Sequence, residues 1–252
     1  MPLPLEVAVF SSQDALTAQS SGAHRIEFNA PGSYPDGGLT PPLDELRLLS
    51  PQLRIPARVM IRPRGPPADG SMDFIYSEAE LELMREAVSE IKAAGVMDVA
   101  RGDGFVFGVL KKHEDGGYVV DEEVCKALVD AAKPVPCVFH RAFDPIAEED
   151  GAWASGLDAL LRCGFEGLLT AGGTPGKFCE NLERLEELAK HVDGKLQIVA
   201  GGGVRHHNVG EPLGVLGGYK KGSVWVHSAA LRSSGDGVDE EELTKLLAQI
   251  QS

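Results

Sequence analysis

The chain has 252 residues, of which 43% are hydrophobic, and it carries a formal net charge of -14 at pH 7. This length allows one large domain or two small ones with an ample core. The acidic balance argues against a nucleic-acid partner, which would need a basic surface patch. No apolar run is long enough to cross a bilayer, and the first residues lack the pattern of a signal peptide. We therefore expect a cytoplasmic protein with neither a membrane nor a nucleic-acid partner.

The four cysteines, Cys125, Cys137, Cys163 and Cys179, are widely spaced and form no C-x-x-C motif. This spacing is typical of free thiols in a reducing compartment rather than of disulfides or a structural zinc site. We expect Cys125, Cys163 and Cys179 on helices as small buried hydrophobes. Because side chains alternate along a strand, Cys137 faces the helices if His140 faces the interior.

Short apolar runs alternate with helical segments along the whole chain. The runs predict strands at residues 5–10, 24–28, 57–61, 104–110, 135–139, 167–170, 196–200 and 223–227. Cap residues or prolines predict helices that begin near Ser11, Thr40, Ser77, Asp121, Glu148, Thr174 (with Pro175 next), Arg205 and Asp239. The helix from Glu148 is expected to run to Cys163, and the helix from Thr174 to about His191.

The alternation predicts a fold of the α/β class. Strand–helix units of roughly 30 residues match a TIM (β/α)8 barrel, which is a closed ring of parallel strands. No linker divides the chain, so residues 1–252 are expected to form a single domain. An open, doubly wound sheet is the alternative, because alternation alone does not show that the sheet closes.

The strand at residues 135–139 ends abruptly in His140 and Arg141, with Asp144 shortly after. Unpaired charge is costly inside a core, so these residues should mark its edge. The carboxyl ends of parallel strands are where such folds hold ligands. For Asp144, the alternative is a helix cap before Pro145 beside a surface salt bridge.

Other predicted strands also end in polar residues or glycines. These are Ser11, Glu27, Asn29, Arg62, Arg64, Thr170, Gly201, Gly202, Gly203, His227 and Ser228. In a barrel they converge on one mouth, although alternation along each strand means that not all of them need point inward.

The residue types indicate an anion site. Guanidinium groups of Arg62, Arg64 and Arg141 suit carboxylates or phosphates. The glycine turn at residues 201–203 can present backbone N–H groups to an anion, and it is expected to run into a helix N-terminus at Arg205. We add Thr170, His227 and Ser228 to this predicted ligand-binding set. The alternative is that the glycines only form tight turns.

Glu27 with His140 or His227 forms a candidate pair of general base and general acid, and Asp144 is a further candidate catalytic residue. The residues therefore favour an enzyme that acts by acid–base chemistry on a small phosphorylated or carboxylated metabolite. The alternative is that Glu27 and Arg62 neutralise one another in a structural ion pair.

Several motifs together resemble the CutC family, whose members are described as copper homeostasis proteins. The motifs are residues 25–27 (RIE), 37–41 (GGLTP), 60–65 (MIRPRG), 73–77 (DFIYS), 139–144 (FHRAFD), 201–204 (GGGV) and 227–229 (HSA). The resemblance implies a barrel, a cytoplasmic location and a role in copper homeostasis, with a copper ion as a candidate ligand at the mouth.

The chain departs from this family where copper should matter. By this resemblance, Asn29 stands where members often carry cysteine, and Ala8 and Val9 stand where some members do; copper(I) prefers sulfur ligands. Met60 is the one sulfur expected near the mouth. If a metal binds, Glu27, His140 and His227 are the candidate ligands, a set that suits copper(II) or zinc better than copper(I). No apolar stripe identifies an interface, so a homo-oligomer is left open.

Overall fold

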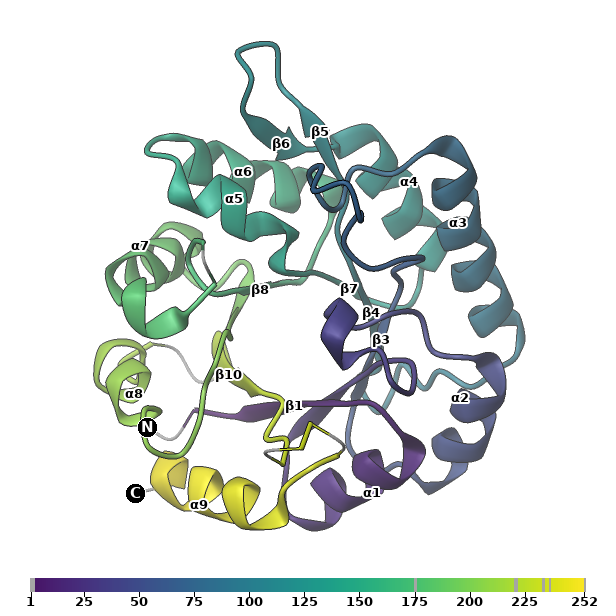
Figure 1. Ribbon diagram of the computed structural model, residues 1–252, viewed down its shortest axis with the longest axis vertical. Coiled ribbons are helices and arrows are strands. Elements are labelled where there is room, and N and C mark those ends of the chain that lie inside the picture. Colours follow the sequence, from purple (N-terminus) through teal and green to yellow (C-terminus); the bar gives the residue numbers. More distant parts are fainter. Residues whose placement is uncertain (1–2, 175, 220–221, 233, 236, 252) are drawn as a thin grey trace.

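A computed structural model describes residues 3–251 except 175, 220, 221, 233 and 236. Within this part of the chain, parallel strands form a closed barrel in the order β1-β10-β9-β8-β7-β4-β3-β2 (Figure 1). The barrel strands are β1 (Leu5–Val9), β2 (Arg25–Phe28), β3 (Ala57–Met60), β4 (Gly104–Phe107), β7 (Cys137–Phe139), β8 (Gly167–Thr170), β9 (Gln197–Ala200) and β10 (Val224–Ser228). β1 pairs with both β2 and β10, which closes the ring. The predicted barrel is confirmed, and the open sheet is excluded.

Helices surround the barrel and cover its strands (Figure 1). The α-helices are α1 (Ser12–Ser20), α2 (Leu43–Leu49), α3 (Glu78–Ala93), α4 (Glu122–Ala132), α5 (Asp144–Glu148), α6 (Ala152–Cys163), α7 (Leu182–Val192), α8 (Gly210–Leu216) and α9 (Glu240–Gln251). Short 3-10 helices are η1 (Tyr34–Asp36), η2 (Ser50–Gln52), η3 (Arg141–Phe143) and η4 (Phe178–Glu180). Across these described ranges, no helix combines the length and apolar character needed to cross a membrane.

Strand register decides which side chains enter the barrel. Met60, Val106 and Val138 form a small apolar cluster of their own, separate from the core between strands and helices. Cys137, next to Val138, belongs to that outer core, as predicted. Because side chains alternate, His140 follows Val138 on the inner face.

The predicted strand at residues 104–110 is wrong in its second half. β4 ends at Phe107, and Leu110 begins β5 (Leu110–Lys112), which pairs antiparallel with β6 (Tyr118–Val120). This hairpin projects from the ring of helices in Figure 1. Gly108 separates the two strands, and a side chain there would meet the His140 ring at 2.7 Å. The end of the strand at Phe107 was not visible in the sequence, because Val109 and Leu110 are also apolar and buried and so extend the apolar run.

Two predicted helices begin or divide differently. α2 begins at Leu43, because the Thr40 hydroxyl pairs with the Arg62 backbone instead of capping a helix. The helix predicted at residues 148–163 begins later, as α6 at Ala152, and Glu148 instead ends the separate short helix α5; Gly151 precedes α6 with a φ of 86°.

Two further helix starts lie later than predicted. α7 begins at Leu182 rather than Thr174, and Pro175 lies outside the described residues. α8 begins at Gly210 rather than near Arg205, whose backbone N–H is bound by the Asn208 side chain at 2.7 Å. The glycine turn at residues 201–203 therefore does not run directly into a helix.

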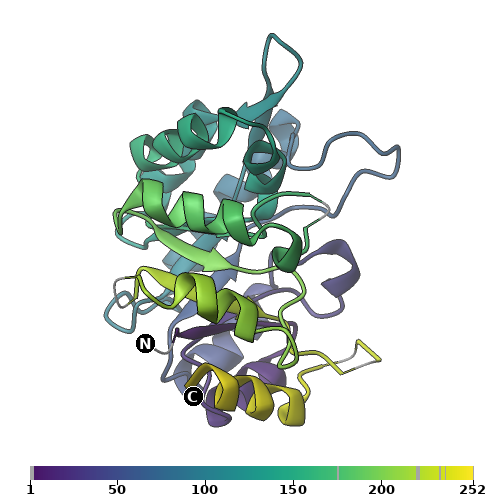
Figure 2. The same ribbon diagram turned by 90° about the vertical axis from the view of Figure 1, so that its left-hand side faces the viewer.

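Figure 2 shows the strands running toward one side of the molecule, with the loop between β3 and α3 projecting there and both chain ends on the opposite side. The loops that follow the strands thus form one face, where the candidate site lies.

Candidate functional site

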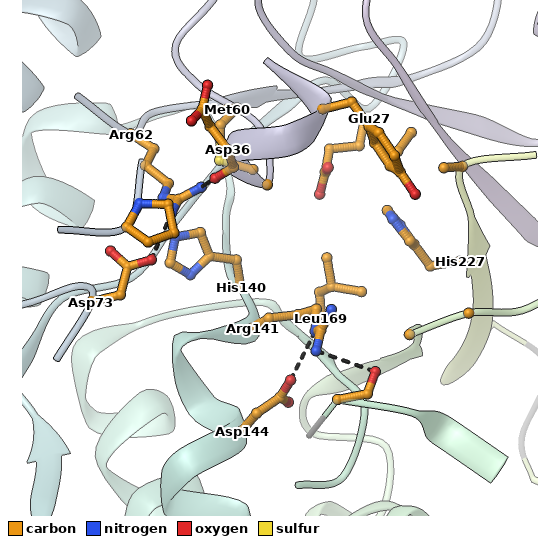
Figure 3. A pocket seen from close by; sticks show the side chains of 18 of the residues that line it. Glu27, Asp36, Met60, Arg62, Asp73, His140, Arg141, Asp144, Leu169 and His227 are labelled. Atoms are coloured by element: carbon orange, nitrogen blue, oxygen red, sulfur yellow. Dashed lines mark hydrogen bonds and ion pairs between the residues drawn. The ribbon is translucent and has the colours of Figure 1, made fainter. Parts of the chain in front are cut away.

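A cavity of about 620 Å³ opens at the carboxyl ends of the barrel strands (Figure 3). Nine residues of the predicted site line it: Glu27, Arg62, His140, Arg141, Asp144, Gly202, Gly203, His227 and Ser228. Arg64, Thr170 and Gly201 are not among the lining residues. The structure thus brings side chains from distant strands to one pocket.

Glu27 and His227 lie on the same side of this cavity (Figure 3). One oxygen of Glu27, one oxygen of Glu6 and one ring nitrogen of His227 all lie within 4.8 Å of one another. His227 Nδ1 is 2.8 Å from Glu6 Oε1, and the other oxygen of Glu6 accepts from Arg25. Asn29 donates to Glu27 Oε1 at 3.2 Å. Glu6 therefore orients His227, and Arg25 holds Glu6.

Sequence reasoning missed Glu6 because it lies inside β1 rather than at its end. The signal was present: Glu6 is a carboxylate within the otherwise apolar run Leu5–Val9. A buried charge at such a position needs a partner within the barrel, and Arg25 of β2 is paired with it in the strand register.

The charges of these groups perturb one another's protonation. Burial alone would raise the pKa of Glu6, but Arg25 and His227 outweigh it and lower the pKa to about 2. Burial raises the pKa of Glu27 above its usual range, even though the nearby His227 opposes this. Burial alone would lower the pKa of His227, but the negative charges of Glu27 and Glu6 raise it instead. The pKa of Glu27 is therefore shifted upward, in the direction of neutral pH, and the protonated form of His227 is favoured by the two carboxylates beside it.

His140 lies across the cavity from Glu27, beside Arg62 (Figure 3). Its Nδ1 accepts the Ala142 N–H at 3.3 Å, so the neutral ring carries its proton on Nε2. Burial, and then the charge of Arg62, lower the pKa of His140 to about 3. The ring is thus a neutral hydrogen-bond donor at physiological pH.

Phe74 packs on both groups of this side of the cavity. Its ring lies 4.7 Å from the His140 ring and 5.0 Å from the Arg62 guanidinium carbon. Its backbone has a φ of 66°, which is uncommon for a residue other than glycine. Backbone conformations of this kind cluster at binding and catalytic sites.

Arg62 fixes the loops around the mouth. It donates to the Asp36 and Gly38 carbonyl oxygens and pairs with Asp73 at 2.7 Å. The alternative of a Glu27–Arg62 ion pair is therefore wrong for this structure. Arg64 pairs with the same Asp73 at 3.2 Å and with Glu80 at 2.5 Å, outside the cavity.

Asp144 joins two strand ends rather than capping its own helix. Its Oδ1 accepts the Thr170 hydroxyl at 2.6 Å and the Ala171 N–H at 2.9 Å, and its Oδ2 pairs with Arg141 at 2.8 Å. The helix-cap alternative is thus wrong. Burial raises the pKa of Asp144, although Arg141 opposes this. Arg141 is 43% exposed, so part of its guanidinium group remains available at the rim.

Sulfur is sparse at this site. Cys125, Cys137 and Cys163 are buried away from the cavity. Cys179 was predicted to lie in a helix as a buried residue, but it lies half-buried in the 3-10 helix η4. No cysteine is among the described residues that line the cavity. Besides Met60, the thioether of Met72 also lines it, which the sequence did not predict.

Comparison with known proteins places this barrel in a family. The model of the CutC family matches residues 3–228. The chain belongs to the CutC family. A human copper homeostasis protein cutC homolog is 36% identical over 205 residues, which cover 81% of this chain and 67% of the relative. A CutC family protein of Treponema denticola is 33% identical over 230 residues, covering 91% of this chain and 82% of that protein. The crystal structure of a CutC protein from Streptococcus agalactiae has a TM-score of 0.73 at 24% identity, covering 90% of this chain and 98% of that one.

Proposed function

We propose that the barrel mouth is an active site that transfers protons on a small anionic metabolite. The observation that carries this proposal is a pair of buried polar atoms, Glu27 Oε2 and His140 Nε2. Within the described part of the chain neither atom has a hydrogen-bond partner, and both residues line the same cavity. Each such atom costs roughly 1–3 kcal/mol of stability. A ligand that bonds to both would recover this energy.

The two groups suit proton abstraction from a carbon next to a carbonyl group. Glu27, whose pKa is raised by burial, is the group that takes the proton. The neutral His140 donates its Nε2–H to the carbonyl oxygen and so stabilises the negative charge that develops there. His227, held by Glu6, is the acid that returns a proton at a neighbouring atom.

The rim supplies the positive charge that an anionic substrate needs. Arg141 and Arg205 line the cavity, and the protein as a whole carries a net charge of -14. A localised positive region on an acidic protein favours a small anion over a nucleic acid.

A deuterium-exchange screen tests the proposal and does not require the product to be identified. The protein is incubated in D2O with a panel of small phosphorylated and carboxylated carbonyl compounds, and incorporated deuterium is measured by mass spectrometry. We expect at least one compound to exchange, and Glu27→Gln to slow that exchange by about 100-fold or more. The surface variant Glu241→Gln serves as the control. If no compound in the panel exchanges deuterium, the proposal fails.

Copper handling is the second candidate function, favoured by the family and by the cluster of Glu6, Glu27 and His227. Two carboxylates and an imidazole suit copper(II) or zinc, whereas copper(I) prefers thiolates and thioethers. Glu6 is already paired with Arg25, which opposes a cation there. The residues therefore fit copper(I) poorly, and a metal ion, if carried, would lie at Glu27 and His227.

Competition experiments distinguish the copper alternatives. We expect glutathione to outcompete the protein for copper(I) under reducing conditions. Binding of copper(I) that survives glutathione, and that is lost on replacing Met60 and Met72 with leucine, would favour direct copper carriage. Binding of copper(II) or zinc that is lost in His227→Gln would favour the carboxylate–imidazole cluster.

We also propose a cytoplasmic location. The four cysteines are free, as is usual in a reducing compartment. Cell fractionation with an antibody against the protein tests this.

A further inference from the structure

The ladder between β9 and β10 stops where the loops of the mouth begin. Val226 pairs with Ala200, and the two strands separate beyond this pair. If the parallel ladder continued, the Gly202 N–H would donate to His227 and the Ala229 N–H would donate to Gly202. Instead, the Gly202 carbonyl accepts the Phe178 N–H at 3.1 Å. The N–H groups of Gly202 and Ala229 are left without an acceptor in the described part of the chain.

Two more N–H groups join them, those of Gly203 and Val204, which also have no acceptor among the described residues. Gly202, Gly203, Val204 and Ala229 all line the cavity, and we call them the amide cluster. Positive φ values of 107° at Gly202 and 81° at Gly203 turn the chain here. Successive backbone N–H groups in such turns form concave sites for anions.

Residue 202 is glycine because another backbone segment packs directly against it. A Cβ atom there would lie 2.3 Å from the Gly176 carbonyl oxygen, whereas a Cβ atom at Gly203 would meet nothing within 4 Å. The loop after β8 therefore lies directly against the loop after β9. Gly203 is open, and its surroundings can accept a side chain or a ligand.

Positive side chains flank the amide cluster. Arg205 lines the cavity and donates from one guanidinium nitrogen to the Leu231 carbonyl at 3.0 Å, which leaves its other N–H groups for a ligand. Arg141 lines the same cavity and is 43% exposed. Guanidinium groups and backbone N–H groups together are the usual partners of a phosphate.

We propose that the amide cluster and Arg205 bind the phosphate group of a small phosphate monoester, which names the substrate class of the proposed active site and rests on that proposed function. Four N–H groups from two loops, with a guanidinium group, suit the three terminal oxygens of a phosphate better than the two oxygens of a carboxylate. Barrels often hold phosphate at these same two loops.

The cluster also lies at a useful place relative to the acid–base pair. A Cβ atom at Gly201 would lie 3.3 Å from the His227 side chain, so the glycine turn adjoins His227. A phosphate bound there directs the rest of the molecule over His227 and Glu27.

Titration with inorganic phosphate, followed by amide NMR of the full-length protein, tests this inference. We expect the amide signals of Gly202, Gly203, Val204 and Ala229 to shift as phosphate binds. Gly203→Asp places a carboxylate beside the cluster, and Gly203→Asn has the same size and tolerates the same positive φ. We expect phosphate affinity to fall about tenfold more in Gly203→Asp than in Gly203→Asn, because the carboxylate repels the negative charge of the phosphate and the neutral amide does not.

Three results would overturn the inference: unchanged amide signals of the cluster in the wild-type protein at millimolar phosphate, equal affinity in the two Gly203 variants, or acetate binding as tight as phosphate binding. The first result does not depend on whether a variant folds. Phosphate binding without any deuterium exchange would support the phosphate site and refute the proposed proton transfer. Exchange on carboxylates alone, without phosphate binding, would refute the phosphate site and leave proton transfer standing.

Discussion

Replacing Glu6 with glutamine should destabilise the protein by about 3 kcal/mol at neutral pH, an estimate that follows from its lowered pKa. Arg25 and His227 outweigh the effect of burial and bring the pKa of this carboxyl from 4.5 down to about 2. Glutamine keeps the size of the side chain but removes its charge, which leaves Arg25 buried without its carboxylate. Loss of one partner from a buried ion pair costs roughly 3–5 kcal/mol in other proteins, which agrees with this estimate.

The stabilising effect of Glu6 should decrease as the pH falls. A carboxyl whose pKa is lower in the folded state stabilises the protein fully above its unfolded pKa, and this contribution is lost as the pH falls toward the folded pKa. Urea unfolding should therefore show a difference in the free energy of unfolding between wild type and Glu6→Gln that narrows from about 3 kcal/mol at pH 7 to roughly half of that at about pH 3. Glu241→Gln, in an exposed pair with Lys245, should remain close to wild type at both pH values. Equal stability of Glu6→Gln and wild type at pH 7, or a gap that does not change with pH, would refute the reasoning.

Three further predictions concern the mouth. The ring signals of His140 should stay constant between about pH 5 and about pH 8, because burial and Arg62 lower its pKa to about 3; a titration in this range by NMR would contradict its neutral role. The pKa of His227 should fall in Glu27→Gln, since the Glu27 charge helps to raise it, and an unchanged pKa would mean that the two groups do not interact. Gly202→Ala should lower the melting temperature more than Gly203→Ala, because only the first brings a Cβ atom against a backbone carbonyl; equal losses would count against the close approach of the two loops.

Local patterns were sufficient to predict the barrel. Each strand is a short apolar run, and cap signals such as Ser77 with Glu80 begin their helices where expected. Patterns failed where a tertiary contact overrides a local signal. Thr40 looks like a helix cap, but its hydroxyl bonds to the Arg62 backbone twenty-two residues away in sequence. The apolar run at residues 104–110 conceals the end of β4 and the start of the β5–β6 hairpin, because the residues on both sides of Gly108 are buried.

For the site, the position of a residue at a strand end predicted that it reaches the mouth. The sequence did not predict which side chain it pairs with there. Glu27, His140 and His227 were placed at one mouth by their positions at strand ends, and they do line one cavity. Arg62 also lines the cavity, but the sequence did not show that it pairs with Asp73 in the loop that follows β3. A sequence cannot show which loop returns to which strand, so the partners of arginine were beyond reach.

Inside the barrel, the side chains near the amino ends of the strands include charged and polar groups, and these groups support the residues of the proposed active site. Barrels are usually filled by layers of branched apolar side chains, but here Arg25 pairs with Glu6 and donates to Gln197 at 2.7 Å. Apolar side chains of similar volume would often be at least as stable as such buried charges. What the charges provide is a carboxylate, fixed by Arg25, that holds His227 by Nδ1 and raises its pKa beside Glu27. A floor of apolar residues would remove one of the two carboxylates that raise the pKa of His227 and would leave the ring without its Nδ1 partner, so the polar interior suits the proposed acid–base pair at the mouth.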